Sequence, residues 1–270
     1  MSDRGIRARG LLVRAGGTPL LVGVDLDVAP GEVVAVLGPN GAGKSTLLGA
    51  LAGDIRLAAG TVRLGGHDLA ALSPAERARA RAVLRQRSLL AAPFTALEVV
   101  RLGQARPDDA TAHAQLEAVE LGAFAARLYP SLSGGEQQRV QLARVLAQLA
   151  ETPGAALLLD EPTAALDLRQ AHLVGRLARA AASRGHPVVV VAHGLELAAA
   201  FADRVVLLRA GTVLAHGSPT AALTSAAVSA AFGLDVVVEH DARGLRIISG
   251  AASPSPMAPG SPDRSARAAT

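Results

Sequence analysis

Cysteine and tryptophan are absent from this 270-residue sequence, and aromatic residues make up only 2% of it. Without cysteine the chain can form neither disulfides nor thiolate metal sites. Because aromatics are so few and no basic stripe accompanies them, no nucleic-acid partner is expected. No apolar run approaches the roughly 18–20 residues of a membrane-spanning helix, and the charged start MSDRGIRARG lacks the apolar centre of a signal peptide. These absences predict a cytosolic chain.

Lysine is almost absent as well. It occurs once, at Lys44, although the chain carries 27 basic residues and a formal net charge of +4. A single lysine among arginines suggests a task for a compact ammonium rather than a planar guanidinium, and chance in a GC-biased genome is the alternative. Half of the residues are apolar, so this length can bury the core of one large domain or two small ones.

Short apolar runs typical of buried strands alternate with helical patterns, which predicts an α/β fold with a largely parallel sheet. Two capping boxes predict helix starts, one at Ser73 with Pro74 in the first helical position and one at Ser133. The segment 87–150 has a mostly helical pattern, and we interpret it as a helical subdomain inserted into one domain of residues 1–250. The predicted buried strands are 32–37, 82–84, 156–159 and 187–192.

The C-terminal part of the sequence is less informative. Residues 218–250 predict one or two helices and a short β-pair, to which we assign no function. Residues 251–270 are rich in Ala, Ser and Pro and cannot bury enough apolar surface to offset the entropy of ordering. A disordered tail is therefore expected there.

A glycine-rich loop between a predicted strand and a predicted helix fits the pattern G-x-x-x-x-G-K-[ST]. Its glycines let backbone N–H groups point at phosphate oxygens, and the following helix N-terminus favours anions. We expect Lys44 between the β- and γ-phosphates and the Ser45 hydroxyl on Mg²⁺. A glycine-rich turn with a surface lysine is the alternative, which this context disfavours. The predicted nucleotide-binding residues of the loop are Gly38, Pro39, Asn40, Gly41, Ala42, Gly43, Lys44, Ser45 and Thr46.

Two adjacent acids, Asp160 and Glu161, end the predicted strand 156–159. We expect Asp160 to hold Mg²⁺ through water and Glu161 to act as general base on the water that attacks the γ-phosphate. A strand that leaves into a polar turn at Pro162 is the alternative. The phosphate loop in the same chain favours the catalytic interpretation.

A second glycine motif, Leu132-Ser133-Gly134-Gly135-Glu136, begins the helix predicted at Ser133. Two glycines leave N–H groups free at the helix tip and the serine hydroxyl adds a donor, so the motif can hold an anion. An ordinary capped helix explains Ser133 and Glu136 but not both glycines. With this motif the sequence resembles the ABC ATPases, whose signature reads LSGGQ or LSGGE, over about residues 10–217.

The resemblance implies a P-loop ATPase core in which a RecA-like parallel sheet and an antiparallel β part are joined to an inserted helical subdomain. It also implies that Ser133, Gly134 and Gly135 grip the γ-phosphate of ATP held by a second copy, so a homodimer is expected. ATP and Mg²⁺ are the implied cofactors, and dimer closure on ATP would drive a membrane partner. Three further residues match elements of the family. Gln86 matches the Q-loop glutamine, which contacts Mg²⁺ and water. Asp167 matches the D-loop at the dimer interface, and His193 matches the switch histidine that contacts the γ-phosphate.

The stretches 93–103 and 129–149 look like those of ATPase subunits of bacterial haem importers. This implies a peripheral subunit on the cytoplasmic face of the inner membrane, bound to integral membrane permease subunits, with a periplasmic haem-binding protein as indirect partner. An importer for siderophores or cobalamin and a soluble non-transport ABC ATPase are the alternatives. Residues 88–101 are expected to form much of the permease docking surface, although Leu89, Leu90, Pro93 and Phe94 could be core residues instead.

Two departures from the family are visible. Many members stack adenine on an aromatic residue, which the stretch 12–17 lacks, so Arg14 or Val13 is the candidate contact. Gly194 follows His193 where the family usually has aspartate, and this is expected to loosen the switch loop.

Overall fold

The computed structural model describes residues 5–86, 93–164, 166–241 and 244–249. The predicted tail 251–270 and two of the candidate docking residues, Leu89 and Leu90, lie outside these ranges. Among the helices within them, none combines the length and the apolar character needed to cross a membrane.

Strands in these ranges form a four-stranded antiparallel sheet, a six-stranded mixed sheet and a hairpin. The antiparallel sheet has the spatial order β2 (Thr18–Val28), β1 (Ile6–Ala15), β4 (Ala59–Leu64) and β5 (His67–Asp68). The mixed sheet has the order β10 (Thr212–Gly217), β9 (Arg204–Arg209), β3 (Val33–Leu37), β8 (Val188–Val191), β7 (Ala156–Asp160) and β6 (Arg81–Leu84). The hairpin is β11 (Val236–Asp241) with β12 (Gly244–Ser249).

The predicted α/β class is confirmed. From β6 through β9 every neighbouring pair in the mixed sheet is parallel, and β10 is an antiparallel edge strand. Strands β3, β6, β7 and β8 agree with the predicted strands to within one residue at each end. Consistent with their apolar sequences, β3, β7 and β8 are buried on both faces, as parallel strands usually are, whereas the edge strand β6 buries only Ala82 and Leu84.

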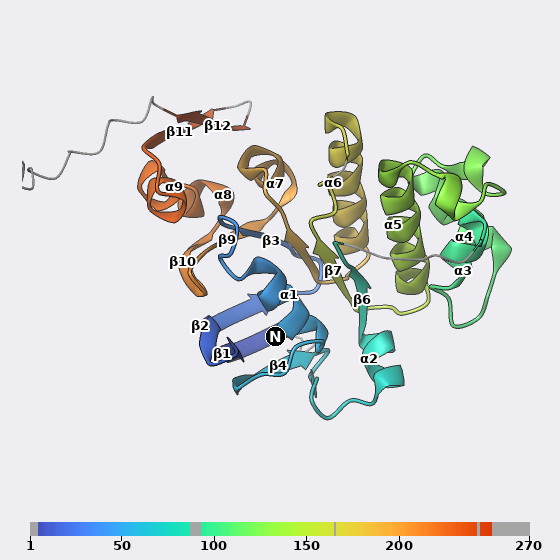
Figure 1. The fold of residues 1–270 in the computed structure, drawn as a ribbon, viewed down its shortest axis with the longest axis horizontal. Coiled ribbons are helices and arrows are strands. Elements are labelled where there is room, and N and C mark those ends of the chain that lie inside the picture. The colour runs from blue at the N-terminus through green and yellow to red at the C-terminus, as the bar shows by residue number, and fades with distance from the viewer. Residues whose placement is uncertain (1–4, 87–92, 165, 242–243, 250–270) are drawn as a thin grey trace, which may run out of the picture.

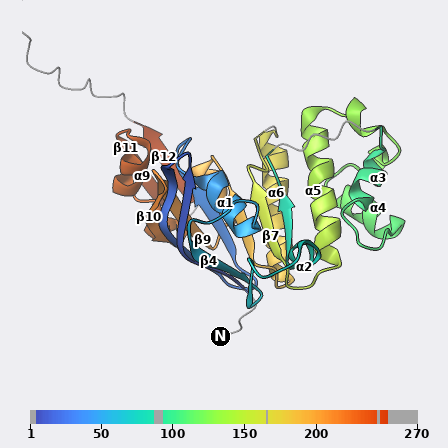
Figure 2. The same ribbon diagram turned by 60° about the horizontal axis from the view of Figure 1, so that its bottom comes forward.

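The helices divide into three groups around the sheets (Figure 1). Figure 2 shows α3, α4 and α5 at one side of the molecule and the C-terminal elements at the opposite side. The group at the first side is α3 (Ala96–Arg101), α4 (Asp109–Ala118) and α5 (Gly134–Ala150), with 3₁₀ turns at Gly122–Phe124 and Tyr129–Ser131. The C-terminal group is α8 (Pro219–Ala222) and α9 (Ser225–Phe232). The third group is α1 (Lys44–Ala52), α2 (Pro74–Ala80), α6 (Leu168–Ser183) and α7 (Leu195–Phe201).

Alternation along the strands distributes their side chains among three hydrophobic clusters. Val34 and Val36 face a cluster that encloses α1 between the mixed sheet and the antiparallel sheet. Ala35 and Leu37 face α7, α8 and α9, whereas Val33 belongs to the cluster with α5 and α6. Helix α1 is therefore held on several sides, which fixes the loop that precedes it.

The capping boxes predicted for α2 and α5 are present, and Pro74 occupies the start of α2. Between β6 and β7 the described residues contain α3, α4, α5 and the two 3₁₀ turns, and the extent 87–150 of an inserted subdomain stays a prediction. The C-terminal part contains the two expected helices and the expected β-pair.

Candidate active site

The glycine-rich loop connects β3 to α1 with backbone angles that favour glycine. Gly38, Gly41 and Gly43 have φ angles of 146°, 78° and 101°. A Cβ on Gly38 would collide with the carbonyl oxygen of Leu208, so only glycine fits this close approach to β9. Gly43 is the N-cap of α1 and offers no side chain as a cap, which leaves the N–H groups of the first turn available to an anion.

Lys44 lies in the hollow of this loop and is only 5% exposed. Its Nζ donates to the carbonyl oxygens of Gly38 and Pro39, at 2.8 and 3.0 Å. Burial lowers the pKa of the Lys44 ammonium, and the carboxylates of Glu161 and Asp160 counteract this effect. A bound phosphate would add negative charge beside the ammonium and so favour its protonated form.

Asp160 and Ser45 meet across the site. The Ser45 Oγ donates to Asp160 Oδ1 at 3.1 Å, which joins the start of α1 to the end of β7. Burial raises the pKa of the Asp160 carboxyl, and the hydrogen bond from Ser45 acts in the opposite direction. A carboxylate beside a hydroxyl is a set of hard oxygen donors, so these two residues fit a Mg²⁺ ion held next to phosphates.

Glu161 is the centre of a compact group of side chains. Its Oε2 accepts from Gln86 Nε2 at 2.5 Å, and its Oε1 is 2.5 Å from His193 Nε2. Gln138 of α5 donates to the Glu161 carbonyl oxygen at 3.1 Å, a contact that the sequence gave no reason to expect. Glu161 is buried and its φ is 48°, in the left-handed region.

The register of the sheet explains this convergence. Leu84 of β6 pairs with Leu159 of β7, and Asp160 pairs with Val191 of β8. Two residues after Leu84, Leu159 and Val191, respectively, come Gln86, Glu161 and His193. Parallel strands end at the same edge of a sheet, which is where ligands bind in folds of this class.

A cavity of about 240 Å³ opens beside the loop, and Glu161 lies on its wall. Its other lining residues are Leu20, Asn40, Gly41, Gly43, Lys44, Ser45 and Thr46. Leu20 of β2 is 37% exposed and was not identified from the sequence, because one leucine in a strand gives no local signal of a binding role.

The suggested base contact through Val13 is wrong. Val13 pairs with Leu21 in the antiparallel sheet and is buried in its core, because strand alternation turns it inward. Arg14 is exposed, and its guanidinium donates to the Gly17 carbonyl oxygen at 3.1 Å. Gly194 begins α7 without a side-chain cap, whereas Asp167 caps α6 by accepting from Gln170 N at 2.8 Å.

The glycine motif at the start of α5 lies outside this cavity. Ser133 and Gly134 are exposed, and a Cβ on Gly134 would have no neighbour within 4 Å. Glu136 Oε2 accepts from both the N–H and the hydroxyl of Ser133, at 2.7 and 2.8 Å. The structure thus brings together Lys44, Ser45, Gln86, Asp160, Glu161 and His193, but it does not place Ser133, Gly134, Gly135 or Asp167 on the cavity wall.

A phosphate loop, an acid pair at the adjacent strand end and a glycine-tipped helix together define an ABC-type nucleotide hydrolase. The ABC transporter family model matches residues 21–164, and the chain belongs to this family of ATPases, whose ATP hydrolysis is coupled to transport. The chain is similar to the hemin import ATP-binding protein HmuV of Rhizobium meliloti (strain 1021), with 45% identity over 87% of this chain and 95% of that protein. The HmuV of Nocardia farcinica (strain IFM 10152) is 49% identical over 90% of this chain and 88% of its own length.

Solved structures show the same fold. One, assigned to the metal-chelate type of ABC transporters and captured in an inward-facing conformation, has a TM-score of 0.76 and 25% identity, covering 92% of this chain and 98% of its own. A dimeric post-hydrolysis ATP-binding cassette, MJ0796 with ADP and Pi, has a TM-score of 0.71 and 29% identity, covering 79% of this chain and 98% of its own. Cassettes of this family therefore bind nucleotides, form dimers and work with membrane components.

Proposed function

We propose that this chain is the ATPase subunit of a bacterial importer whose cargo is haem. The observation that carries the proposal is the convergence of Lys44, Ser45 and Glu161 on one cavity, with Asp160 hydrogen-bonded to Ser45. The proteins to which this chain is similar are named for hemin import. The likeness to a structure assigned to the metal-chelate type agrees with a cargo of that chemical class.

Each residue of the site has a role in phosphoryl transfer to water. The loop N–H groups and the Lys44 ammonium hold the phosphates, and Ser45 and Asp160 would hold Mg²⁺. Mg²⁺, when bound, neutralises charge that develops on the phosphate oxygens. Glu161 takes a proton from the attacking water, while Gln86 and His193 hold its carboxylate in place.

The exposed tip of α5 supports a proposal of a homodimer. Ser133 and Gly134 present donors to solvent at a distance from the cavity of their own chain. A second copy arranged around a two-fold axis would bring this tip to the phosphates held by its partner, and each site would then contain parts of both chains. Asp167, at the start of α6, would lie at the same interface.

The proposed docking partner is an integral membrane permease, which would place the chain on the cytoplasmic face of the inner membrane. In the described part of segment 88–101, Phe94 is partly buried against the core, whereas Arg101 is 40% exposed and pairs with Asp109 at 3.2 Å. Arg101 is therefore the better candidate for a permease contact, and Phe94 supports the fold. A periplasmic haem-binding protein would act on the far side of that permease.

The central test measures ATP hydrolysis by the purified chain and hemin uptake by cells with the complete transporter. Glu161→Gln should lower turnover about 1,000-fold, because a positioned general base contributes about 100- to 10,000-fold, while ATP binding persists. Turnover that survives in Glu161→Gln would contradict the assignment of the base. Uptake of a siderophore or cobalamin in place of hemin would contradict the cargo and leave the ATPase site intact.

A further inference from the structure

Asp54 lies where helix α1 ends, far along the chain from the catalytic strand ends. Its backbone is fixed by that helix: Gly53 ends α1 in the left-handed conformation, and Asp54 N donates to Gly49 O at 2.9 Å. This arrangement is a common glycine-based helix terminus, in which the next N–H groups satisfy the last carbonyls of the helix. The Asp54 carboxylate is therefore presented from a rigid element, and its side chain is only 21% exposed.

Two arginines, Arg81 at the start of β6 and Arg85 directly after its end, converge on this carboxylate. Arg81 Nη2 lies 3.3 Å from Asp54 Oδ1, and Arg85 Nη2 lies 2.7 Å from Asp54 Oδ2. Arg81 also donates through Nε to the Ala52 carbonyl oxygen, so the start of β6 is already attached to α1. The pair with Arg85 makes a second attachment at the opposite end of the same strand.

Arg85 is the residue directly before Gln86, whose amide holds Glu161 at 2.5 Å. Gln86 extends beyond the last paired residue of β6, so the sheet ladder itself does not restrain it. The Arg85 side chain is 60% exposed and makes its short contact with Asp54, which limits where the adjoining backbone can lie. The contacts form a continuous series from α1 through Asp54 and Arg85 to Gln86 and Glu161.

We propose that Asp54 is a positioning residue that, through Arg85, holds Gln86 in reach of Glu161. The arrangement connects the helix that begins at Lys44 to the loop that orients the base, so both ends of α1 take part in assembling the site. The inference rests on the proposed role of Gln86 in hydrolysis. It concerns positioning only, because Asp54 touches neither the cavity wall nor the acid pair among the contacts described.

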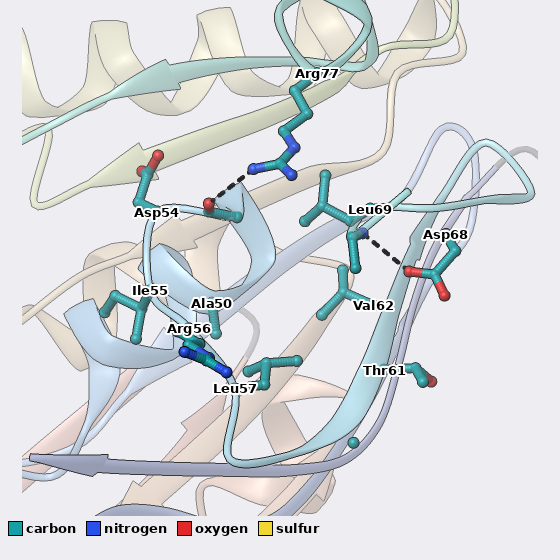
Figure 3. A pocket seen from close by; sticks show the side chains of 13 residues that line it. Ala50, Asp54, Ile55, Arg56, Leu57, Thr61, Val62, Asp68, Leu69 and Arg77 are labelled. Carbon is teal, nitrogen blue, oxygen red and sulfur yellow. Dashed lines mark hydrogen bonds between the residues drawn. The ribbon is translucent and has the colours of Figure 1, made fainter. Parts of the chain in front are cut away.

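Figure 3 shows the surroundings of Asp54, which lines a hollow between the end of α1, β4 and α2. The volume of this hollow is about 540 Å³. Asp54 and Asp68 lie at different edges of this hollow. Asp68 accepts from the Ala70 N–H at 2.9 Å, within its own turn. Asp68→Asn is therefore a matched control, since it makes the same chemical change on the same hollow without touching the series of contacts to Gln86.

Steady-state ATPase kinetics of the purified full chain test the proposal with Asp54→Asn, Arg85→Gln, their double variant and Asp68→Asn. We expect kcat to fall about tenfold in each single variant, since misplacing a catalytic group by about 1 Å can cost up to about 100-fold. KM for ATP should change by less than about twofold, because a group used only in the transition state alters kcat rather than binding. The double variant should be no slower than either single variant, because both changes break one series of contacts.

Asp54→Glu should recover most of the lost turnover, a rescue that a general loss of folding would not show. Unchanged kcat in Asp54→Asn, or additive losses in the double variant, would overturn the proposal. If Asp54→Asn does not fold, the test relies on Arg85→Gln, which changes an exposed side chain. A wild-type kcat in Arg85→Gln would also overturn the proposal. Gln86→Ala distinguishes a failure of this inference from a failure of the role proposed for Gln86. Wild-type turnover in Gln86→Ala would contradict a role of Gln86 in hydrolysis. Lower turnover in Gln86→Ala, together with wild-type turnover in Asp54→Asn, would contradict only the positioning role of Asp54.

Discussion

At the scale of single residues, the site depends on backbone conformations that most side chains avoid. Glu161 has a φ of 48°, which costs about 1–3 kcal/mol for a residue with a side chain. Its N–H donates to Val191 O at 3.1 Å and its carbonyl accepts from Gln138, so the surroundings maintain this conformation. The bend also explains how neighbouring acids, which a regular strand would point in opposite directions, both reach the site.

Substituting glycines of the phosphate loop should have unequal effects. In Gly41→Ala only the positive φ of 78° opposes the new methyl group, since nothing lies within 4 Å, and the cost should be about 1–2 kcal/mol. In Gly38→Ala the Cβ also meets the Leu208 carbonyl oxygen, so the loop must move and ATP affinity should fall at least about tenfold. Thermal unfolding and ATP titration measure both effects, and equal affinities in the two variants would contradict this account.

Asp203 should contribute a pH-dependent part of the stability. Burial raises the pKa of its carboxyl, but hydrogen bonds from Arg179 and the Val33 N–H outweigh it, and the pKa lies below its usual value. The contribution is therefore present above the unfolded-state pKa of about 3.9 and is lost as the pH falls through the lower folded-state value. Because the side chain is 40% exposed, we expect Asp203→Asn to cost only about 1 kcal/mol at pH 7.

Denaturant unfolding at several pH values tests this expectation. The difference between wild type and Asp203→Asn should shrink as the pH falls below about 4. A difference that grows towards acid pH would contradict the sign. Asp235→Asn, at an exposed carboxylate before β11 that has no ion pair or side-chain hydrogen bond among the described residues, serves as a control for a general change in charge.

At the scale of elements, the same capping chemistry begins three helices. Ser73 with Glu76 caps α2, Thr95 with Glu98 caps α3, and Ser133 with Glu136 caps α5. In α5 the hydrogen bonds from the backbone and hydroxyl of Ser133 lower the pKa of Glu136 and keep its carboxylate ionised. Two glycines follow only this third cap among the three, so its surface is open to a ligand in a way that the other two are not.

Ser133→Ala and Ser73→Ala therefore form a matched pair. Each should destabilise the protein by about 1 kcal/mol through loss of a cap. Ser133→Ala should in addition reduce ATP-dependent dimer formation and ATP turnover. It removes the hydroxyl that, in the proposed homodimer, donates to the γ-phosphate of ATP bound by the second copy. Thermal unfolding, sizing in ATP and phosphate release distinguish the two effects. Equal loss of turnover in Ser73→Ala would show that stability alone accounts for the result.

At the scale of the whole molecule, the proposed homodimer would take a different half of each of its two sites from one chain. The cavity beside Lys44 and the exposed tip at Ser133 belong to separate parts of the fold, on α1 and α5. Helix α5 is nevertheless attached to the catalytic edge, because Gln138 donates to the Glu161 carbonyl oxygen. Further along the same helix, Gln148 donates to the Arg81 carbonyl oxygen at 3.1 Å, at the opposite end of the sheet. Helix α5 thus presents the exposed tip at its start and, one turn further on, contacts the backbone of Glu161.

Mixing two inactive variants tests the shared site. Lys44→Ala removes the phosphate contact, and Ser133→Arg blocks the tip with a bulky side chain. A mixed dimer of the two contains one site with both halves intact, so partial ATP turnover should return on mixing although each variant alone has none. Absence of any recovery, with mixed dimers shown to form, would contradict a site composed of two copies.

Local patterns in the sequence determined the fold class, strands β3, β6, β7 and β8 of the mixed sheet and the capped starts of α2 and α5. They did so because strand periodicity, helix caps and the glycine loop are properties of short windows. The motifs also named the residues that the structure brings together at the strand ends. Tertiary structure alone decided the parallel register that aligns Gln86, Glu161 and His193, the left-handed bend at Glu161, and the choice of Leu20 over Val13 for the cavity wall. These depend on which strands become neighbours and which face is buried, and such contacts join residues far apart in the chain.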